Sequence, residues 1–274
     1  MRRFFTWKRV TVAVVAVLAL AVLAPAVTLL VDHWFARRTL GTIVAQLDRD
    51  DPDWRLDDIV RATNAELPPD DRNPFVLATA ANDLLPADCY KRSADFPDWS
   101  KCPPNVMLDP PAKAKLLAAM RGMEPALDAA RDLADLPEVG GNVLVMPADP
   151  MTRLMGKEQD LRLTAALLRA DAVLLAEGGR TDEAVRSVRA ALGTARAMGN
   201  DPTLIGQLVR MALGVVAGHA AENVIDLGEP DCGLAELQAE LLREAATPKL
   251  VVGLRGDRGS FAQTSEFVLG PRLY

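Results

Sequence analysis

The sequence predicts an all-α protein in which an N-terminal transmembrane helix precedes an array of about eight helices. Aromatic residues make up only 5% of the 274 residues, which disfavours sheets because strands prefer aromatic and β-branched side chains. After residue 50, apolar residues recur at helical spacing through most of the chain. An uncharged run near the N-terminus is long enough to span a bilayer.

The uncharged run extends from Val10 to Val31. As a helix these 22 residues would be about 33 Å long, against a hydrocarbon core of about 30 Å. Phe4, Phe5, Trp7, Trp34 and Phe35 flank the run, where interfacial aromatic residues are expected. The bilayer is therefore the predicted partner of residues 10–31, between a basic tail at 1–9 and a juxtamembrane segment at 32–50.

A cleaved signal peptide is the alternative interpretation of this segment. Ala24, Pro25 and Ala26 match a small-x-small cleavage pattern. The apolar run continues past that point and exceeds the usual 7 to 15 residues of a signal peptide, which favours an uncleaved anchor. Both interpretations place residues 51–274 outside the cytoplasm as one helical domain.

Charge predicts the orientation. Arg2, Arg3, Lys8 and Arg9 precede the run, so the positive-inside rule puts the N-terminus in the cytoplasm. The predicted location is therefore the inner membrane of the cell, which the chain crosses once. Because residues 1–38 carry six basic residues and one acidic residue, the net charge of −6 leaves −11 for residues 39–274. Such an acidic domain disfavours nucleic-acid binding, which requires basic patches.

Proline pairs predict where helices begin. Asp51-Pro52, Asn73-Pro74, Asp109-Pro110 and Asp201-Pro202 each offer an N-cap side chain before proline at the first helical position. Thr247-Pro248 is a fifth such pair. We expect short helices near 56–67 and 74–85, a proline-rich loop at 86–105, a helix at 110–134 that is kinked or split at Pro125, and an irregular stretch at 137–150.

The C-terminal half shows the clearest helical periodicity. Apolar stripes predict five further helices, which together with the earlier ones complete the array. The residues expected to be buried are Leu154, Leu161, Ala165, Leu168, Ala172 and Leu175; Ala184, Val188, Ala191, Ala195 and Met198; Ile205, Leu208, Ala212, Val216, Ala220 and Val224; Leu234, Leu237, Leu241 and Ala245; and Leu250, Leu254, Phe261 and Val268.

Residues 167–198 resemble one tetratricopeptide-type helix hairpin. Gly178 stands at the turn, and Ala184 and Ala191 stand where the two helices would approach closely. Such repeats recur about every 34 residues, and the resemblance covers one hairpin only. It implies a solenoid-like array, whereas an ordinary alanine-rich helix pair explains the same residues.

A broader resemblance rests on three segments. Asp51 to Val60, Asp201 to Arg210 and the run Leu-Arg-Gly-Asp-Arg-Gly that starts at Leu254 are similar to a family of membrane-anchored helical proteins of planctomycete bacteria. The resemblance covers most of the chain after residue 47. It implies an extracytoplasmic helical domain and carries no activity over to any residue.

No set of residues predicts a catalytic, cofactor or metal site. The chain has two histidines, His33 and His219, and no Cys/His spacing of the kind that binds zinc. His219 falls near the apolar stripe of its segment, so we expect a core histidine there. The sequence contains neither a glycine-rich phosphate loop nor a Gly-x-Ser-x-Gly elbow.

The cysteines predict a structural role. Cys89 and Cys102 bracket the proline-rich loop, and a thiol pair outside the cytoplasm can oxidise. A disulfide closing this loop would contribute about 3 kcal/mol in the chain-entropy model. Cys232 would then be unpaired, either as a small buried residue or as an exposed thiol.

Arg258 is the candidate buried charge. It shares the stripe of Leu254 and Phe261, and a charge on a buried stripe requires an acidic partner, so a structural ion pair between helices is expected.

Two functions fit these features. A membrane-tethered scaffold or interaction module of the cell envelope would bind an unknown protein in grooves between helices. An envelope enzyme of hydrolase type would instead need a cleft lined by carboxylates and arginine. An apolar groove would favour the first function, and a charged cleft would favour the second.

Overall fold

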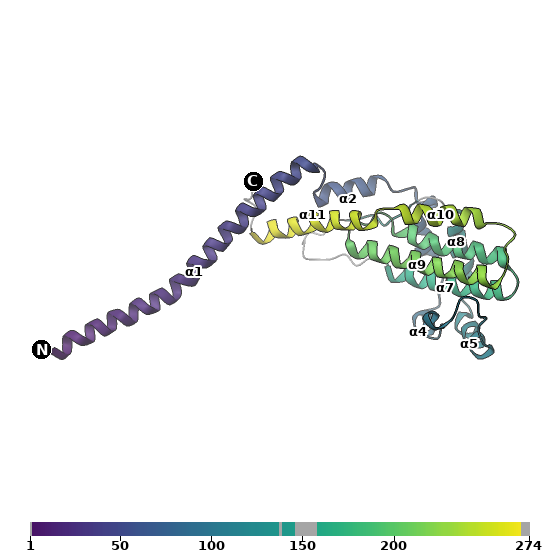
Figure 1. Ribbon diagram of the computed structural model, residues 1–274, viewed down its shortest axis with the longest axis horizontal. Helices are drawn as coiled ribbons and strands as arrows, with labels where there is room; N and C mark the ends of the chain where they lie inside the picture. Colours follow the sequence, from purple (N-terminus) through teal and green to yellow (C-terminus); the bar gives the residue numbers. More distant parts are fainter. Residues whose placement is uncertain (1, 137–138, 146–157, 270–274) are drawn as a thin grey trace. The chain divides into compact units, whose positions relative to one another are not determined.

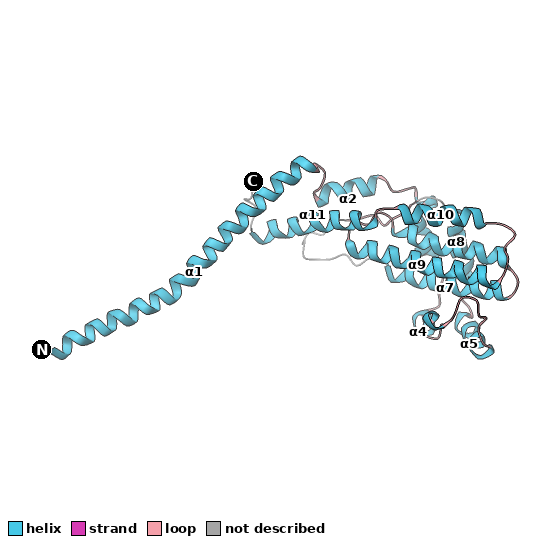
Figure 2. Ribbon diagram, viewed as in Figure 1, coloured by secondary structure: helices cyan, strands magenta, loops and turns pink. Residues whose placement is uncertain are grey.

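The computed structural model describes residues 2–136, 139–145 and 158–269, and it is helical with no strand among them (Figures 1 and 2). The all-α prediction is therefore confirmed. The chain divides into two compact units. One comprises Met1–Trp54 with Thr264–Tyr274, and the other comprises Arg55–Gln263.

Helix α1 (Arg2–Asp50) forms the first unit's main element. It runs through Pro25 without ending and continues across the predicted juxtamembrane segment. The described side chains of its uncharged run are exposed, including Val12, Leu20 and Leu29, whereas Val44 near its end is buried. By length and composition, α1 can cross a membrane.

The second unit contains the remaining helices, with α11 included as far as Gln263. The structure has more and shorter helices here than the eight expected, because 3₁₀ turns and short helices fill the predicted loops. In chain order they are α2 (Leu56–Ala65), η1 (Asp70–Arg72), α3 (Pro74–Asp83), α4 (Cys89–Ser93), η2 (Trp99–Lys101), α5 (Pro110–Met120), α6 (Glu124–Arg131), η3 (Asp132–Asp135), α7 (Glu158–Glu177), α8 (Thr181–Met198), α9 (Leu204–Leu227), α10 (Leu234–Ala246) and α11 (Lys249–Leu269).

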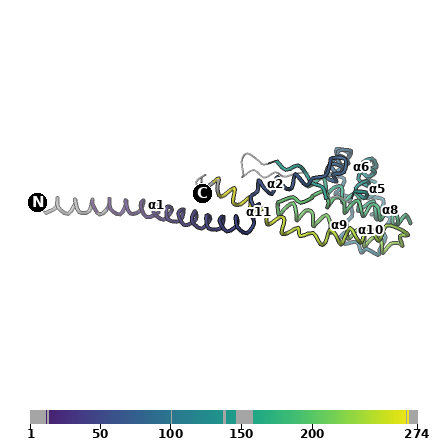
Figure 3. Tube along the Cα trace, turned by 90° about the horizontal axis from the view of Figure 1, so that it is seen from above, coloured from purple at the N-terminus to yellow at the C-terminus, as the bar shows by residue number. Residues whose placement is uncertain are grey.

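Helices α7, α8 and α9 pack against one another as the centre of this unit (Figure 1). Helix α8 is the most enclosed, because α6 packs against it on one side and α10 on the other (Figure 3). The small residues Ala184 and Ala191 of α8 are fully buried. Since alanine brings helix backbones close together, the stripes predicted for α7 and α8 are confirmed as core faces.

The turn between α7 and α8 also follows the prediction. Gly178 and Gly179 end α7, and Gly179 has a φ of 76°. A residue in this left-handed region is most often glycine. The helix pair at 167–198 is thus present, although α7 begins earlier than the resembling segment.

Two of the five predicted N-caps are confirmed. The Asn73 side chain accepts a hydrogen bond from the Phe75 N–H, and Asp109 accepts one from Ala112. The prediction at Asp201 was wrong, because α9 starts later with Thr203 as its N-cap. Asp201 instead accepts bonds from the Thr203 backbone and hydroxyl groups. The pair Asp51-Pro52 also precedes no helix directly, since α2 starts at Leu56.

The segment expected at 110–134 is split into α5 and α6. The break occurs at Gly122, whose φ is 77°, whereas Pro125 lies in the first turn of α6. Proline is well tolerated there because that position has no intrahelical N–H bond to lose. The segment 137–150 was predicted to be irregular. The structure describes residues 139–145 of this segment, and they are not helical.

The buried face of α11 differs from the prediction. Leu250, Leu254 and Phe261 are 50%, 57% and 72% exposed, and the side chain of Val268 lies outside the described part of the chain. Gly253 and Gly256 are buried instead, and a Cβ on Gly253 would lie 2.8 Å from the Leu204 Cα. Helix α11 therefore packs its glycine face on the start of α9 and leaves its large apolar side chains in solvent.

Candidate functional site

The centre of the second unit contains charged residues that the sequence analysis did not single out. Glu240 of α10 accepts hydrogen bonds from Arg189 and Arg196 of α8, at 2.7 Å and 3.3 Å. Asp171 of α7 accepts two bonds from Arg131 of α6 and one from the Ser187 hydroxyl of α8. These pairs hold helices of different sequence segments in register, because each is charge-assisted and largely shielded from water.

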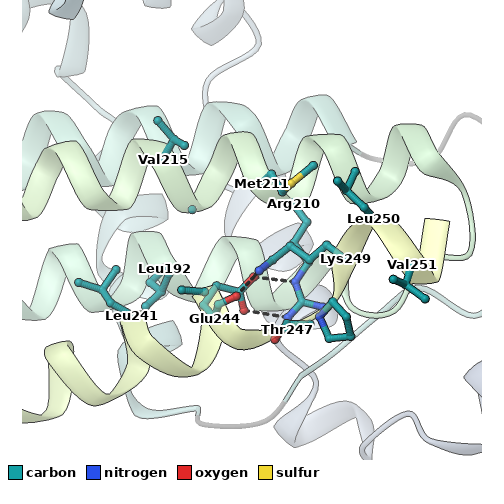
Figure 4. Close-up of a pocket in the computed structure, with 13 residues that line it drawn as sticks. Leu192, Arg210, Met211, Val215, Leu241, Glu244, Thr247, Lys249, Leu250 and Val251 are labelled. Carbon is teal, nitrogen blue, oxygen red and sulfur yellow. Dashed lines mark hydrogen bonds and ion pairs between the residues drawn. The ribbon is translucent and has the colours of Figure 1, made fainter. Parts of the chain in front are cut away.

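An apolar groove opens between α9, α10 and the start of α11 (Figure 4). Its volume is about 550 Å³. Its lining residues are Leu192, Arg210, Met211, Gly214, Val215, Leu241, Glu244, Ala245, Thr247, Pro248, Lys249, Leu250 and Val251. Three of these aliphatic side chains stand at its mouth largely in solvent, with Val215 57%, Leu250 50% and Val251 64% exposed.

A charged cluster lies beneath this apolar lining. Arg210 of α9 is fully buried and donates from Nε and Nη2 to the two carboxylate oxygens of Glu244, at 2.7 Å and 2.8 Å (Figure 4). The Lys249 ammonium lies 3.2 Å from the same carboxylate. Two cations thus share one carboxylate, and the base of the groove has one excess positive charge.

The carboxyl group of Glu244 is ionised in this setting. Burial by itself would raise its pKa, but the hydrogen bonds and charge of Arg210, with the charge of Lys249, outweigh burial and lower the pKa below 4.5. The pair also has backbone support, because Arg210 donates to the Gly199 carbonyl at 2.8 Å. Gly199 ends α8 with a φ of 61°, and this conformation directs its carbonyl towards α9.

The periodicity of α9 explains why Arg210 was missed. The sequence stripe placed Ile205 and Leu208 in the core, but they are 43% and 47% exposed. The buried face carries Gln207 and Arg210 instead. A signal was present in the sequence, since Gln207, Arg210 and Leu213 also recur at three-residue spacing, but an apolar criterion discards polar residues.

A second, polar pocket of about 450 Å³ lies where the loop around η2 meets α7 and α9. It is lined by Trp99, Lys101, Cys102, Pro103, Pro104, Arg169, His219, Glu222 and Asn223. The prediction of a core histidine at position 219 was wrong. The His219 side chain is 53% exposed, and its Nδ1 lies 2.9 Å from a Glu222 carboxylate oxygen.

All three cysteines are free thiols, with Cys89 buried, Cys102 partly buried and Cys232 exposed. The disulfide between Cys89 and Cys102 is not formed in this structure and stays a prediction. Cys102 lines the polar pocket.

Arg258 is half-buried on α11. Its expected stripe does not form a core face, because Leu254 and Phe261 are exposed. Arg169, Arg196 and Arg210 are more deeply buried than Arg258, and a buried ion pair at Arg258 stays a prediction.

Among the described residues, no group of three or more His, Cys, Asp or Glu side chains is placed to hold a metal ion. Comparisons with protein-family models, with curated proteins and with solved structures give no match to this chain. Geometry and charge alone therefore indicate what the groove and the pocket can bind.

Proposed function

We propose that the protein is a membrane-tethered interaction module whose groove between α9, α10 and α11 binds a helix of another envelope protein. The partner helix would present an apolar face flanked by an acidic side chain. The observation that carries this proposal is the apolar groove, whose mouth exposes Val215, Leu250 and Val251.

Exposed apolar area supports a binding role. Large contiguous apolar surfaces are uncommon on isolated soluble domains and mark interaction sites. Leu242 of α10 and Leu254 of α11 are also more than half exposed. Both add exposed aliphatic area on α10 and α11, and such side chains are suited to the apolar anchors that an amphipathic helix presents.

The backbone of α9 supports a helix as the occupant. An added Cβ at Gly214, in the groove, or at Gly218, one turn later, would meet nothing within 4 Å. Small residues four positions apart allow two helix backbones to approach closely. A partner helix can therefore lie over Gly214 while its apolar side chains fill the groove.

Charge specifies the partner further. The base of the groove has one positive charge in excess, because Arg210 and Lys249 share Glu244. An acidic side chain beside the apolar anchors would complement this charge, whereas a basic one would be repelled.

The location is part of the same proposal. Helix α1 would anchor the chain in the inner membrane with its N-terminus in the cytoplasm, and the helical domain would face the outside. The basic residues before the apolar run support this orientation through the positive-inside rule.

Photo-crosslinking tests the proposal in cells. A benzophenone side chain at Val215 or Val251 of the full-length protein should crosslink to one common segment of another protein, and mass spectrometry should show apolar residues at helical spacing with a neighbouring Asp or Glu. Leu250→Asp should abolish this crosslink. Benzophenone at Leu117 of α5, which is 52% exposed, is the matched control and should not give it.

Crosslinks to a second copy of this chain, or to unrelated segments from the two groove positions, would overturn the proposal. So would a crosslink that Leu250→Asp leaves unchanged.

A further inference from the structure

The polar pocket contains a buried arginine, Arg169, that has no carboxylate partner among the described residues, unlike the buried Arg196 and Arg210. Arg169 of α7 is only 9% exposed. Its Nη2 donates to the Asn223 side-chain oxygen at 3.4 Å, and its guanidinium lies 4.8 Å from the centre of the Trp99 ring. Its Nε makes no hydrogen bond among the described residues.

The other buried arginines have carboxylate partners. Arg196 contacts Glu240 and Arg210 contacts Glu244. Within the described part of the chain, no carboxylate oxygen lies within 4.0 Å of the Arg169 guanidinium. Burial lowers the pKa of Arg169, and electrostatic interactions with Cys102 and then with Glu222 counteract this only in part.

The neighbouring charges of the pocket are already engaged. Glu222 faces His219 at 2.9 Å, and Lys101 pairs with Asp98 at 2.8 Å. A buried guanidinium with an unused donor is costly unless an anion reaches it. Because the pocket opens onto Arg169, a bound ligand can supply that anion.

We propose that this pocket binds a small organic molecule through a single carboxylate group. The Arg169 guanidinium would donate to the carboxylate from Nε and a terminal nitrogen, in the forked geometry that arginine favours. Trp99, Pro103 and Pro104 line the pocket and provide apolar surface for the rest of the molecule.

The charge of Glu222 selects for a monoanion. Its carboxylate lines the same pocket, so a doubly charged ligand such as phosphate would be repelled more strongly than a carboxylate. The volume of about 450 Å³ fits a ligand of the size of benzoate or somewhat larger.

Titration of the full-length protein in detergent micelles with benzoate, acetate and inorganic phosphate tests this. Calorimetry should show saturable binding of benzoate, with weaker binding of acetate and of phosphate. Arg169→Met should weaken benzoate binding by about tenfold or more, since it removes charge-assisted hydrogen bonds. Arg162→Met, at an exposed arginine on the same helix, is the matched control and should bind as the wild type does.

A second variant keeps the test independent of folding defects. Asn223→Asp places a carboxylate beside Arg169 within the chain itself. We expect it to raise the melting temperature and to abolish benzoate binding, because the internal carboxylate occupies the guanidinium.

No saturable binding of benzoate to the wild type would overturn the proposal, as would equal binding by Arg169→Met. Unchanged binding by Asn223→Asp would show that the guanidinium is not the anchor. Phosphate binding tighter than benzoate binding would overturn the assignment of a monocarboxylate.

Discussion

At the scale of single residues, Glu244 determines the stability of the groove. Replacing it with glutamine leaves Arg210 fully buried without a counter-charge. Removal of one partner from such a pair typically costs about 3–5 kcal/mol. We expect Glu244→Gln to lower the free energy of unfolding by that amount in chemical denaturation, whereas Glu236→Gln, on the first turn of the same helix, should change it little. Equal stability of the two variants would contradict a structural role for the pair.

The same carboxylate gives a pH dependence. The folded pKa of Glu244 lies below its ordinary value of 4.5, so its full contribution to stability is present above about pH 4.5. This contribution is lost as the pH falls through the lowered folded pKa. Denaturation curves recorded at decreasing pH below 4.5 should therefore show a steeper loss of stability for the wild type than for Glu244→Gln.

Cys232 provides a second prediction at this scale. The charge of Asp182, together with slight desolvation and a hydrogen bond, raises the pKa of this exposed thiol. Less thiolate is present at neutral pH, so alkylation should be slower than for an ordinary exposed cysteine. Asp182→Asn should accelerate iodoacetamide labelling severalfold, since asparagine retains an acceptor for the Cys232 N–H and removes the charge. The exposed neighbour Glu183 serves as the control through Glu183→Gln, and identical rates in both variants would refute the electrostatic explanation.

At the scale of elements, α11 depends on its glycine face. A Cβ at Gly256 would overlap the backbone carbonyl group of Pro202, and backbone atoms at the start of α9 cannot easily move away. We expect Gly256→Ala to destabilise the protein by about 1–3 kcal/mol, which is typical of overpacking. Gly214→Ala is the matched control, because a Cβ at Gly214 would meet only open space. The free energy of unfolding of this variant should equal that of the wild type or exceed it by up to about 1 kcal/mol, since alanine favours a helix more than glycine does. If both variants unfold alike in thermal melts, the close packing of α11 on α9 is wrong.

The elements also show what sequence patterns can predict. Where a helix buries an apolar stripe, as α7 and α8 do, periodicity alone identified the core residues such as Leu168 and Val188. Periodicity was also correct at the end of α9, where Ala220 and Val224 are buried, but it failed at the start of α9 and along α11, where the buried faces carry Arg210 or glycine. Those residues are compatible with a core only because of tertiary partners, Glu244 for Arg210 and Pro202 for Gly256, and a single sequence does not indicate such pairings.

The candidate sites were predictable to a smaller degree than the fold. Arg169, Trp99 and His219 are separated by up to 120 positions in the chain, and only packing of the η2 loop against α7 and α9 brings them to one pocket. The groove likewise depends on three helices whose exposed residues carry no local signature. Site prediction therefore required the tertiary structure, whereas helix content did not.

At the scale of the whole molecule, the proposed function requires a helical domain that is anchored to the membrane by α1. Within the described residues, two helices are long and apolar enough to cross a membrane, α1 and α9. Helix α9 packs against α7 and α8, which is typical of a core helix. Helix α1 has no buried side chain in its apolar window, so it is the element that we assign to the bilayer.

The location of the helical domain is the central claim, and the exposed thiol of Cys232 allows a direct test. Intact cells that express the full-length protein are treated with a membrane-impermeant maleimide at mildly alkaline pH, and Cys232→Ser defines the background from Cys89 and Cys102. We expect Cys232 to be labelled in intact cells whose outer envelope admits the reagent, in a protein that sediments with membranes. Labelling that appears only after the inner membrane is lysed would contradict the account, because it would place the groove and the polar pocket in the cytoplasm.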